Sequence, residues 1–259
     1  MRVINDIKRY SLYLLCATRA RLKAEVTNSY LNWIWWILEP FCYMLIYTII
    51  FGYIFASGED KFPVYIFIGS TMWTFFSKTI AASVTMIRAK ESVISKVYIP
   101  KYILLIVEML VNGFKLLVSS CLTAIMLVIF KVQITWNILW VIPVLLIFFM
   151  VTFCIGTILM HIGIYVNDLS QIIGIVLNML MYFTGIFFSI ESRVKEPLCS
   201  ILGIGNPVAF LLTSTRKAVM YASTPELPIL AVWAVLSVVI SAIGIRLIYK
   251  NENTYVKIM

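Results

Sequence analysis

Five polar or charged side chains lie inside otherwise apolar stretches of this sequence, and these residues have the greatest capacity for chemistry there: Glu39, Lys78, Glu108, Asn112 and Lys115. A charge at the centre of a membrane-spanning helix costs roughly 2.5–3.5 kcal/mol on insertion scales, so such groups face other helices or water. Glu39, Lys78 and Glu108 lie at similar distances from the same end of their stretches, which places a charge cluster at one depth. The cluster either holds helices together, which we favour, or forms part of a gate or conduit.

The stretch that contains Glu108 carries a polar stripe. Asn112, Lys115, Ser119 and Thr123 follow Glu108 at intervals of four, three, four and four residues. These intervals keep all five side chains on one face of a helix. That face must therefore lie against protein or water and not against lipid.

No pattern of a known catalytic site accompanies these residues. The sequence has no Gly-x-x-x-x-Gly-Lys-Ser/Thr loop for ATP, no His-Glu-x-x-His and no Gly-x-Ser-x-Gly. Its five cysteines are scattered and it has one histidine, so a metal site or a disulfide framework is not expected. We expect that histidine, His161, to be a packed, hydrogen-bonded residue. Because no cofactor is expected in the chain, any work that it does must draw on a partner or an ion gradient.

Long apolar segments must position these side chains. The chain of 259 residues is 62% hydrophobic and 13% charged, which is about half the charge of a soluble domain. About 20 apolar residues cross a bilayer as a helix, and a helix satisfies its own backbone groups in hydrocarbon. The sequence thus predicts an all-α integral membrane protein, a single domain over residues 1–259. Its six transmembrane helices are expected at 31–56, 63–85, 102–130, 138–165, 171–190 and 228–249.

The basic residues indicate how the chain is oriented. Lys and Arg concentrate before residue 30, between residues 88 and 101, and after residue 245, which by the positive-inside rule places both termini in the cytoplasm. The net charge of +9 then reflects topology and contact with anionic membrane lipid, and no nucleic acid partner is expected. No cleavable signal peptide is evident, so we expect the first span to start insertion.

Residues 1–27 are too polar to span a membrane and predict a cytoplasmic amphipathic helix that lies in the membrane interface. Its apolar side includes Ile7, Leu14 and Leu15. Its cations are Arg9, Arg19, Arg21 and Lys23. The helix is either a simple anchor or a docking surface for a cytoplasmic partner, and its periodicity does not decide between the two.

Two further segments depart from the pattern of apolar helix and short loop. Residues 87–101 mix charged and apolar side chains, which fits a short amphipathic helix stopped by Pro100. We favour a helix that contacts another protein over a solvated loop, because a plain connector needs no apolar face. Residues 191–226 contain two short apolar pieces, 198–202 and 208–212, which predict two re-entrant or interfacial helices before the sixth span.

Five motifs occur in order along the chain. They are the interfacial N-terminal helix, the entrance Asn-Trp-Ile-Trp-Trp-Ile-Leu-Glu-Pro at 32–40, Lys-Val-Tyr-Ile-Pro at 96–100, Asn167-Asp168, and Asn206-Pro207 followed by Arg216. In this order and spacing, the chain resembles the permease subunit of ABC-2 polysaccharide exporters, a family with O-antigen, capsular polysaccharide and teichoic acid permeases. The resemblance covers nearly the whole chain. One departure is Asn32, which stands where the family commonly has glycine.

The resemblance implies partners and a membrane. Such permeases are similar in forming homodimers that bind two separate ATPase subunits, which hold ATP and Mg, in the bacterial plasma (inner) membrane. Their cargo is a polysaccharide on an undecaprenyl-pyrophosphate-type lipid. The segment 87–101 would be the coupling helix that sits in the ATPase, through Arg88, Lys90, Glu91, Ser92, Lys96, Tyr98 and Pro100. The helices of 191–226, with Asn206, Pro207 and Arg216, would cap the exit of a channel at the dimer interface.

The residue types fit such a channel. Sugars stack on aromatic rings, so the expected lining is Tyr30, Trp33, Trp36, Tyr43, Tyr47, Tyr182, Phe183 and Phe187. A lipid pyrophosphate needs cations at the cytoplasmic entrance, where Arg21 and Lys23 are nearest. Two alternatives stay open: an ABC-2 permease for a drug, an ion or a small lipid, and a membrane enzyme that acts on a lipid-linked sugar. The enzyme would need catalytic groups gathered at one interface, and no convincing set is present.

Overall fold

The computed structural model of the chain describes residues 2–27, 32–55, 59–94 and 97–258. All regular structure in these ranges is helical, which confirms the predicted all-α class. The elements in chain order are α1 (Arg2–Arg9), α2 (Ser11–Thr27), η1 (Asn32–Ile34), α3 (Trp35–Tyr47), η2 (Thr48–Ile54), α4 (Phe62–Ala89), α5 (Glu91–Ile94), α6 (Lys101–Ile129), η3 (Trp136–Trp140), α7 (Val141–Tyr165), α8 (Leu169–Phe183), α9 (Ile190–Arg193), α10 (Leu198–Gly203), α11 (Pro207–Val219) and α12 (Leu227–Ile258).

Within those described ranges, four helical segments are long and apolar enough to cross a membrane: Trp35–Ile54, Lys101–Ile129, Trp136–Tyr165 and Leu227–Glu252. They match four of the six predicted spans. The other two predicted spans correspond to α4 and α8. Helix α4 has 28 residues, about 42 Å at 1.5 Å per residue, but serines, threonines and Lys78 make it more polar. Helix α8 is apolar but has only 15 residues. Their crossing of the membrane stays a prediction.

Several helix ends differ from the predicted ones. Helix α4 continues to Ala89 and α12 to Ile258, because helical structure does not stop where hydropathy falls. Helix α8 ends at Phe183, well before residue 190, because Gly185 adopts a left-handed conformation with φ of 70°. The first predicted span, 31–56, divides into α3 and the π-helical η2.

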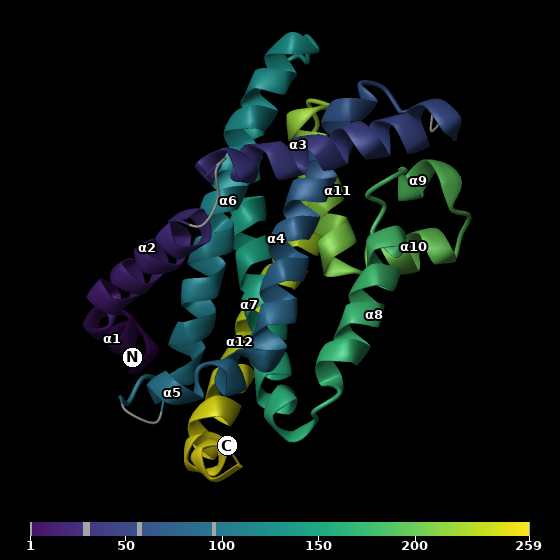
Figure 1. Cartoon of the computed structure of the whole chain (residues 1–259). Helices are drawn as coiled ribbons and strands as arrows, with labels where there is room; N and C mark the ends of the chain where they lie inside the picture. The colour runs from purple at the N-terminus through teal and green to yellow at the C-terminus, as the bar shows by residue number, and fades with distance from the viewer. Residues whose placement is uncertain (1, 28–31, 56–58, 95–96, 259) are drawn as a thin grey trace.

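Helix α4 lies at the centre of the bundle and packs against α6, α7 and α11 (Figure 1). Glycines allow the closest crossings. A Cβ atom added at Gly163 of α7 would lie 2.1 Å from the carbonyl oxygen of Val84 in α4. One added at Gly244 of α12 would lie 2.3 Å from Oγ1 of Thr157 in α7. Small residues at crossings bring helix backbones close enough for extensive van der Waals contact.

Figure 1 shows α3 lying across α4 and α6 and not alongside them. At its start, the Trp36 ring meets Phe114, near the middle of α6, with ring centroids 5.6 Å apart. Beyond α3, Gly52 in η2 faces the ring of Phe62 at the start of α4. The segment therefore climbs obliquely from the middle of the bundle toward the end opposite the termini.

Helices α10 and α11 return into the bundle. The side chain of Asn206 caps α11 by accepting hydrogen bonds from the backbone N–H groups of Val208 and Ala209, at 3.0 and 3.4 Å. Residues 205–208 share a cavity with Phe76 and Ile155, which lie near the middles of α4 and α7. Helix α11 then runs, largely buried, against both of these helices. Two short helices are thus present before α12 as predicted, and their re-entry into a membrane stays a prediction.

Arg216 fixes the other end of α11, and its side chain is 2% exposed. It donates hydrogen bonds to the carbonyl oxygens of Tyr65, Gly185 and Ile186, at 2.7 to 3.2 Å. It also stacks on the Tyr65 ring, 3.4 Å from the centroid. Because Gly185 and Ile186 follow the end of α8, one guanidinium joins α4, α8 and α11.

The two termini lie at the same end of the bundle (Figure 1). There the Asp6 carboxylate of α1 accepts hydrogen bonds from the hydroxyls of Tyr102 in α6, at 2.9 Å, and Tyr249 in α12. Beside it, Glu252 of α12 accepts a hydrogen bond from the Tyr98 hydroxyl at 2.9 Å and pairs with Lys101 at 3.3 Å. The first helix, the last helix and the start of α6 are thus joined by side chains.

The crossing at Gly163 yields a stability prediction. Gly163→Ala is expected to lower the midpoint of thermal unfolding in detergent by several degrees, since overpacking of a tight contact costs about 1–3 kcal/mol. The matched control is Gly174→Ala in α8, where an added Cβ meets nothing within 4 Å. That control is expected to be neutral or slightly stabilising. Equal unfolding midpoints for the two variants would contradict the packing described at Gly163.

Candidate functional site

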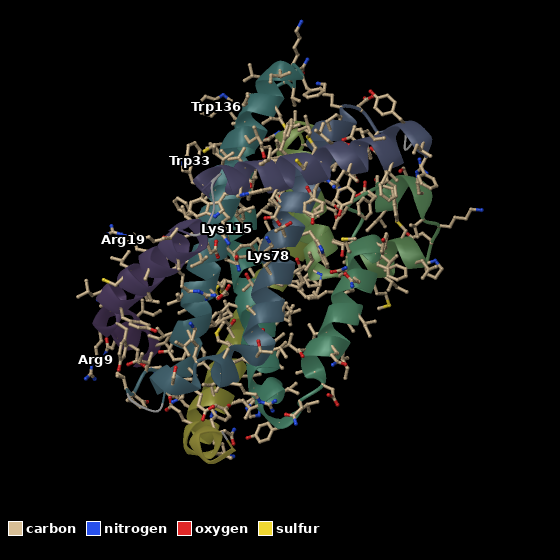
Figure 2. All side chains as sticks on the ribbon, viewed as in Figure 1. Arg9, Arg19, Trp33, Lys78, Lys115 and Trp136 are labelled. Atoms are coloured by element: carbon tan, nitrogen blue, oxygen red, sulfur yellow. The ribbon has the colours of Figure 1, made fainter. Side chains whose placement is uncertain are left out.

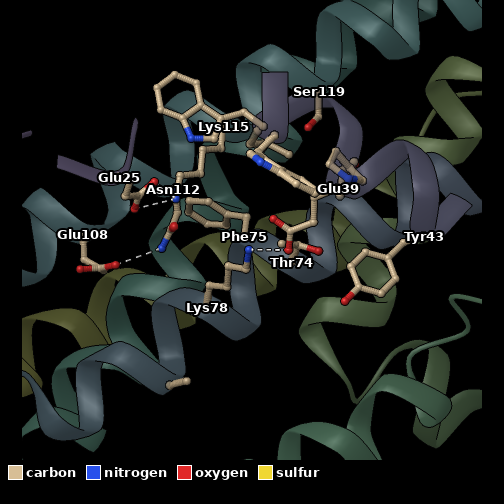
Figure 3. Close-up of a pocket in the computed structure, with 16 residues that line it drawn as sticks. Glu25, Glu39, Tyr43, Thr74, Phe75, Lys78, Glu108, Asn112, Lys115 and Ser119 are labelled. Carbon is tan, nitrogen blue, oxygen red and sulfur yellow. Dashed lines mark hydrogen bonds and ion pairs between the residues drawn. The ribbon is translucent and has the colours of Figure 1, made fainter. Parts of the chain in front are cut away.

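The five polar residues predicted inside apolar stretches line one cavity of about 620 Å³ (Figure 3). Its walls come from α2, α3, α4 and α6. Glu39 of α3 and Lys78 of α4 face it from one side, and Glu108, Asn112 and Lys115 face it from α6. Aromatic rings complete the wall: Trp35, Trp36, Tyr43 and Phe75. The cavity thus offers charged groups, an amide and aromatic faces to one space.

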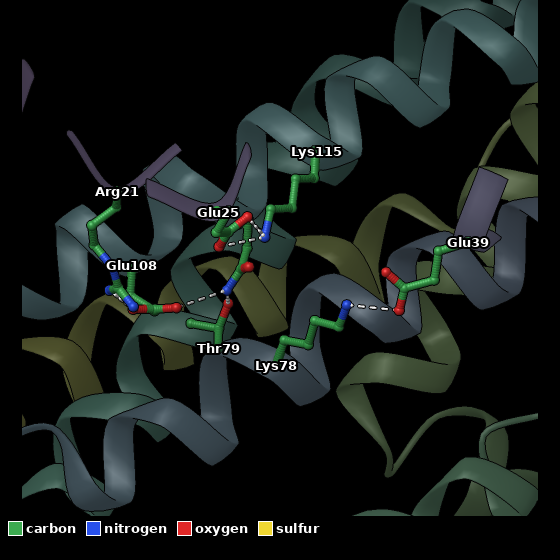
Figure 4. A network of polar contacts seen from close by, with 8 residues as sticks. Arg21, Glu25, Glu39, Lys78, Thr79, Glu108 and Lys115 are labelled. Atoms are coloured by element: carbon green, nitrogen blue, oxygen red, sulfur yellow. Dashed lines mark hydrogen bonds and ion pairs between the residues drawn. The ribbon is translucent and has the colours of Figure 1, made fainter. Parts of the chain in front are cut away.

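Ion pairs join the helices around this cavity (Figure 4). Lys78 Nζ lies 2.9 Å from Glu39 Oε1, which links α4 to α3. Lys115 Nζ lies 2.7 Å from Glu25 Oε2, which links α6 to α2. The predicted charge cluster therefore divides into pairs, and each pair connects a helix of the central bundle to an N-terminal helix.

Glu108 is the most deeply buried of these charges, with 9% of its side chain exposed. It pairs with Arg21 of α2 and accepts a hydrogen bond from Asn112 Nδ2 at 3.5 Å. Asn112 also donates to Thr79 Oγ1 of α4, at 3.1 Å. A buried carboxylate that loses its partner costs about 3–5 kcal/mol. The Arg21–Glu108 pair therefore holds α2 against α6.

The polar stripe of α6 reaches the cavity as far as Ser119. Thr123, one turn further, lines a different cavity, and its hydroxyl donates to the Ser119 carbonyl. Glu25 is the residue that sequence reasoning missed. In the sequence, Glu25 is only a single carboxylate near the end of a basic segment. Its closeness to α6 becomes evident only from the packing of α2 against α6.

Helix α2 contacts α6 through one narrow face, which carries Leu14, Arg21 and Glu25. The apolar side predicted for residues 1–27 stays a prediction, and its side chains have different surroundings in the protein. Leu14 is buried, but Leu15 is 57% exposed and Ile7 is 38% exposed. The helix also breaks at Tyr10, between α1 and α2. The backbone N–H groups of Tyr10 and Leu14 still donate to carbonyl oxygens four residues earlier, at 2.8 and 2.9 Å, so the chain keeps a helical path there.

The predicted cations of this segment have different surroundings. Arg21 is half-buried on Glu108, whereas Lys23 is exposed. Arg9 and Arg19 are exposed and point away from the bundle, while Lys78 and Lys115 lie within it (Figure 2). Of the two residues predicted for a pyrophosphate, the structure thus leaves Lys23 more accessible than Arg21.

Four of the predicted lining aromatics gather at the crossing of α3 with the end of α8. The Phe187 ring meets Tyr47 at 4.9 Å and Tyr182 at 5.7 Å between centroids, and Tyr43 stacks on Tyr47 at 5.9 Å. Phe51, which was not predicted, stacks on Phe187 at 4.3 Å. Phe187 itself is 2% exposed, so this ring fills the cluster while Tyr43 and Tyr182 form its open surface.

The remaining predicted aromatics lie elsewhere. Trp36 lines the polar cavity, and Trp33, at the start of the same segment, is 57% exposed. Phe183 borders the cavity beside Asn206 and Pro207. Tyr30 lies outside the described residues. The structure therefore supplies two aromatic groups, one at the polar cavity and one around Phe187.

The segment predicted to contact a partner protein lies at the end that holds both termini (Figure 1). Its helix, α5, is a single turn, Glu91–Ile94, and ends well before Pro100, which instead precedes the first turn of α6. Glu91 and Ser92 are exposed and Lys90 is partly buried. The predicted helix is thus shorter than expected, because the chain continues as an irregular segment from Val97 to Pro100.

Other residues of this segment make contacts within the chain. Arg88 donates to the carbonyl oxygen of Ile164 at the end of α7, and Tyr98 donates to Glu252. Pro100 is buried. Lys96 lies outside the described residues. Tyr98 is nevertheless 62% exposed and Val97 55%, so these two residues, with Glu91 and Ser92, form the part of the segment that is open to another protein.

His161 has the surroundings predicted for a packed residue. Its Nδ1 lies 2.6 Å from the Tyr255 hydroxyl, and its ring meets Tyr165 edge-on. Within residues 2–27, 32–55, 59–94 and 97–258, no three His, Cys, Asp or Glu side chains come together as a metal site requires.

Comparison with known proteins identifies the family. The model of the ABC-2 type transporter family matches residues 13–220. The chain is 24% identical over 240 residues to an O-antigen export system permease protein RfbA of Myxococcus xanthus, covering 93% of this chain and 92% of the relative. It is 19% identical over 247 residues to a Klebsiella pneumoniae protein of the same description, covering 95% and 94%. It is 26% identical over 244 residues to the polysialic acid transport protein KpsM of Escherichia coli, covering 86% and 87%.

The family match spans well over half of the chain, and the similarity to the relatives extends along nearly all of it. ABC-2 permeases work with ABC ATPase partners. The chain accordingly belongs to the ABC-2 type transporter family, as a membrane subunit without a catalytic domain.

Proposed function

We propose that this chain is the permease of an ATP-driven exporter that moves lipid-linked polysaccharide, such as O-antigen, capsule or teichoic acid, out of the cytoplasm of a bacterium. The observation that carries the proposal is similarity along almost the whole chain to proteins described as O-antigen export permeases. The permease works as a homodimer in the plasma membrane, with two ATPase subunits that bind ATP and Mg.

The composition of the cavity between α2, α3, α4 and α6 supports this cargo. A sugar presents hydroxyls that both donate and accept hydrogen bonds, and Glu39, Lys78 and Asn112 offer matching groups. Its apolar C–H faces fit aromatic rings such as Trp36 and Phe75. The pyrophosphate of the carrier lipid is expected to bind near the exposed Lys23, which lies in α2 close to the cavity-lining residue Glu25.

The helix lengths support the predicted topology. With both termini in the cytoplasm, α3 with η2, α4, α6, α7, α8 and α12 are the six spans. A hydrocarbon core is roughly 30 Å thick. The 28 residues of α4 form a helix about 42 Å long, which exceeds that thickness, whereas a helix of 15 residues such as α8 is shorter than it. Helix α11 begins near the middles of α4 and α7, so we expect α8 and α11 together to cover the full thickness.

A permease for a drug, an ion or a small lipid is the alternative. An open cavity with charged walls does not by itself distinguish these substrates from a glycan. The genes beside the one for this chain discriminate: an ATPase gene among sugar-transferase genes supports polysaccharide export, and a drug-resistance or lipid-synthesis neighbourhood supports the alternative.

The direct test is reconstitution. The permease is expected to co-purify with the ATPase encoded beside it, and in nanodiscs the complex is expected to hydrolyse ATP several-fold faster with lipid-linked glycan from the source organism. Carrier lipid without glycan is the control. Stimulation by a drug or a simple phospholipid but not by the glycan would replace the proposal with its alternative.

The Lys78–Glu39 pair gives a second prediction. Lys78→Glu places two carboxylates together and is expected to reduce export at least tenfold, because like charges at this distance repel. The double variant Lys78→Glu with Glu39→Lys restores opposite charges and is expected to recover much of the export, measured as surface polysaccharide. A double variant as inactive as the single one would show that the pair acts through something other than its mutual contact.

Coupling to the ATPase gives a third prediction. Glu91→Lys reverses an exposed charge on α5 and is expected to reduce co-purification with the ATPase several-fold, while leaving the amount of permease in the membrane unchanged. The matched control is Asp168→Lys, an exposed charge in the turn between α7 and α8. If only the control weakened ATPase binding, the coupling role would belong to that turn and not to α5.

A further inference from the structure

A second polar cavity, of about 440 Å³, lies between the turn before α4, the start of α9 and the end of α11. In Figure 1 these elements lie toward the end of the bundle away from both termini. The walls carry two acidic residues, Glu59 and Glu191, and two basic residues, Arg216 and Lys217. Hydroxyl groups of serines, a threonine and tyrosines occupy most of the remaining wall.

Two of these four charges, Glu191 and Lys217, form an ion pair with each other at 2.9 Å, and Arg216 and Glu59 remain. Arg216 is buried, and it donates only to backbone carbonyl oxygens. None of the ion pairs formed among the described residues includes Arg216 or Glu59. A fixed cation and a carboxylate thus border the same space without touching each other. Because Arg216 is 2% exposed and its guanidinium donates to three carbonyl oxygens, Glu59 is the one of these two charges that a ligand can reach directly.

The Glu59 carboxylate has spare capacity to accept hydrogen bonds. One oxygen accepts from the Tyr221 hydroxyl at 3.3 Å, and the other from Ser192 Oγ at 3.4 Å. Hydroxyl–carboxylate bonds are usually about 2.5–2.7 Å long. Both contacts are therefore weak, and two neighbouring hydroxyls on a ligand could approach the same oxygens more closely.

The neighbouring groups keep fixed protonation states. Burial, and then the Glu59 carboxylate, raise the pKa of Tyr221 to about 12, so its hydroxyl remains a donor. Burial alone would lower the pKa of Lys217, but hydrogen bonds from its ammonium to Glu191 and Glu226, at 2.9 and 3.0 Å, raise it. Lys217 is therefore a charged donor at the edge of this cavity.

The balance of charge indicates the class of ligand. A simple anion in this cavity would lie near Glu59, and a simple cation would lie near Arg216, so neither is well matched. A neutral polyhydroxy compound suits both walls, because each hydroxyl donates to a carboxylate or accepts from a cation. The Tyr221 ring, 47% exposed, adds an aromatic face.

We propose that this outer cavity is a sugar-binding subsite that holds one or two residues of the glycan as it leaves the membrane, with Glu59 accepting hydrogen bonds from a pair of neighbouring hydroxyls. The inference rests on the proposed function, since it takes the cargo to be a polysaccharide. It adds a contact made by each protomer with the sugar chain, separate from the cavity that faces α2 and α3.

The test measures sugar binding at Glu59. The probe is a set of oligosaccharides cut from the lipid carrier of the source organism's own polysaccharide, and saturation-transfer NMR reports their binding to the permease–ATPase complex in nanodiscs. Glu59→Gln is expected to weaken binding about tenfold, as expected for loss of a hydrogen-bonded charge. The matched control, Asp60→Asn, removes the same charge from the adjacent exposed residue and is expected to bind as the unmodified complex does.

The outcomes separate this inference from the proposed function. Glu59→Gln is expected to retain ATPase association and glycan-stimulated hydrolysis, with less polysaccharide exported per ATP. If Glu59→Gln does not assemble, Glu59→Asp withdraws the carboxylate while keeping its charge and is expected to weaken binding at least threefold. Equal binding by Glu59→Gln and Asp60→Asn, or no transfer to the oligosaccharides in the unmodified complex, overturns the subsite. Lack of glycan-stimulated hydrolysis in the unmodified complex overturns the proposed function instead.

Discussion

Polar groups inside an apolar bundle must find their partners within the protein, and this constraint explains most of the tertiary contacts described above. Arg216 is the clearest case, because its charge is buried and its donors reach three carbonyls, one in α4 and two in the segment after α8. The carbonyls of Gly185 and Ile186 follow the end of α8, where the helix has no backbone donors left to offer them. One side chain thus finds partners for its own buried charge, supplies donors to carbonyls that lack them, and fixes α11 beside α4.

The same constraint assembles the cavity between the N-terminal helices and the core. Lys78 and Lys115 project from α4 and α6, and their carboxylate partners come from α3 and α2. At Glu108 the signs are exchanged: the carboxylate projects from α6 and its cationic partner comes from α2. The N-terminal helices are therefore joined to the bundle by ion pairs as well as by buried side chains such as Leu14 and Met44, whereas α7 and α12 cross their neighbours closely at glycines. Contacts made by charge around an open, polar space can be exchanged for contacts with a polar cargo, and close packing cannot.

The helical class and four of the spans could be predicted from hydropathy, because length and apolar content depend on local sequence alone. The gathering of Glu39, Lys78 and Glu108 around one cavity was also predictable, since isolated charges in apolar stretches have few other places to go. Which acidic residue pairs with which basic residue was not predictable. Arg21 and Glu25 reach α6 only because α2 packs along it, and no periodicity within residues 1–27 encodes that path. Hydropathy likewise gives the length of α3 but not its oblique direction, which depends on packing against its neighbours.

Asp6 joins Tyr102 and Tyr249, so the beginning of the chain, the start of α6 and the last helix meet on a single carboxylate. Glu252 lies beside them and bonds to Tyr98. At the end of the bundle that holds both termini, these contacts join the irregular segment before α6 to the first and last helices. A displacement of the irregular segment before α6 would therefore be transmitted to both chain ends, although they are remote from it in sequence.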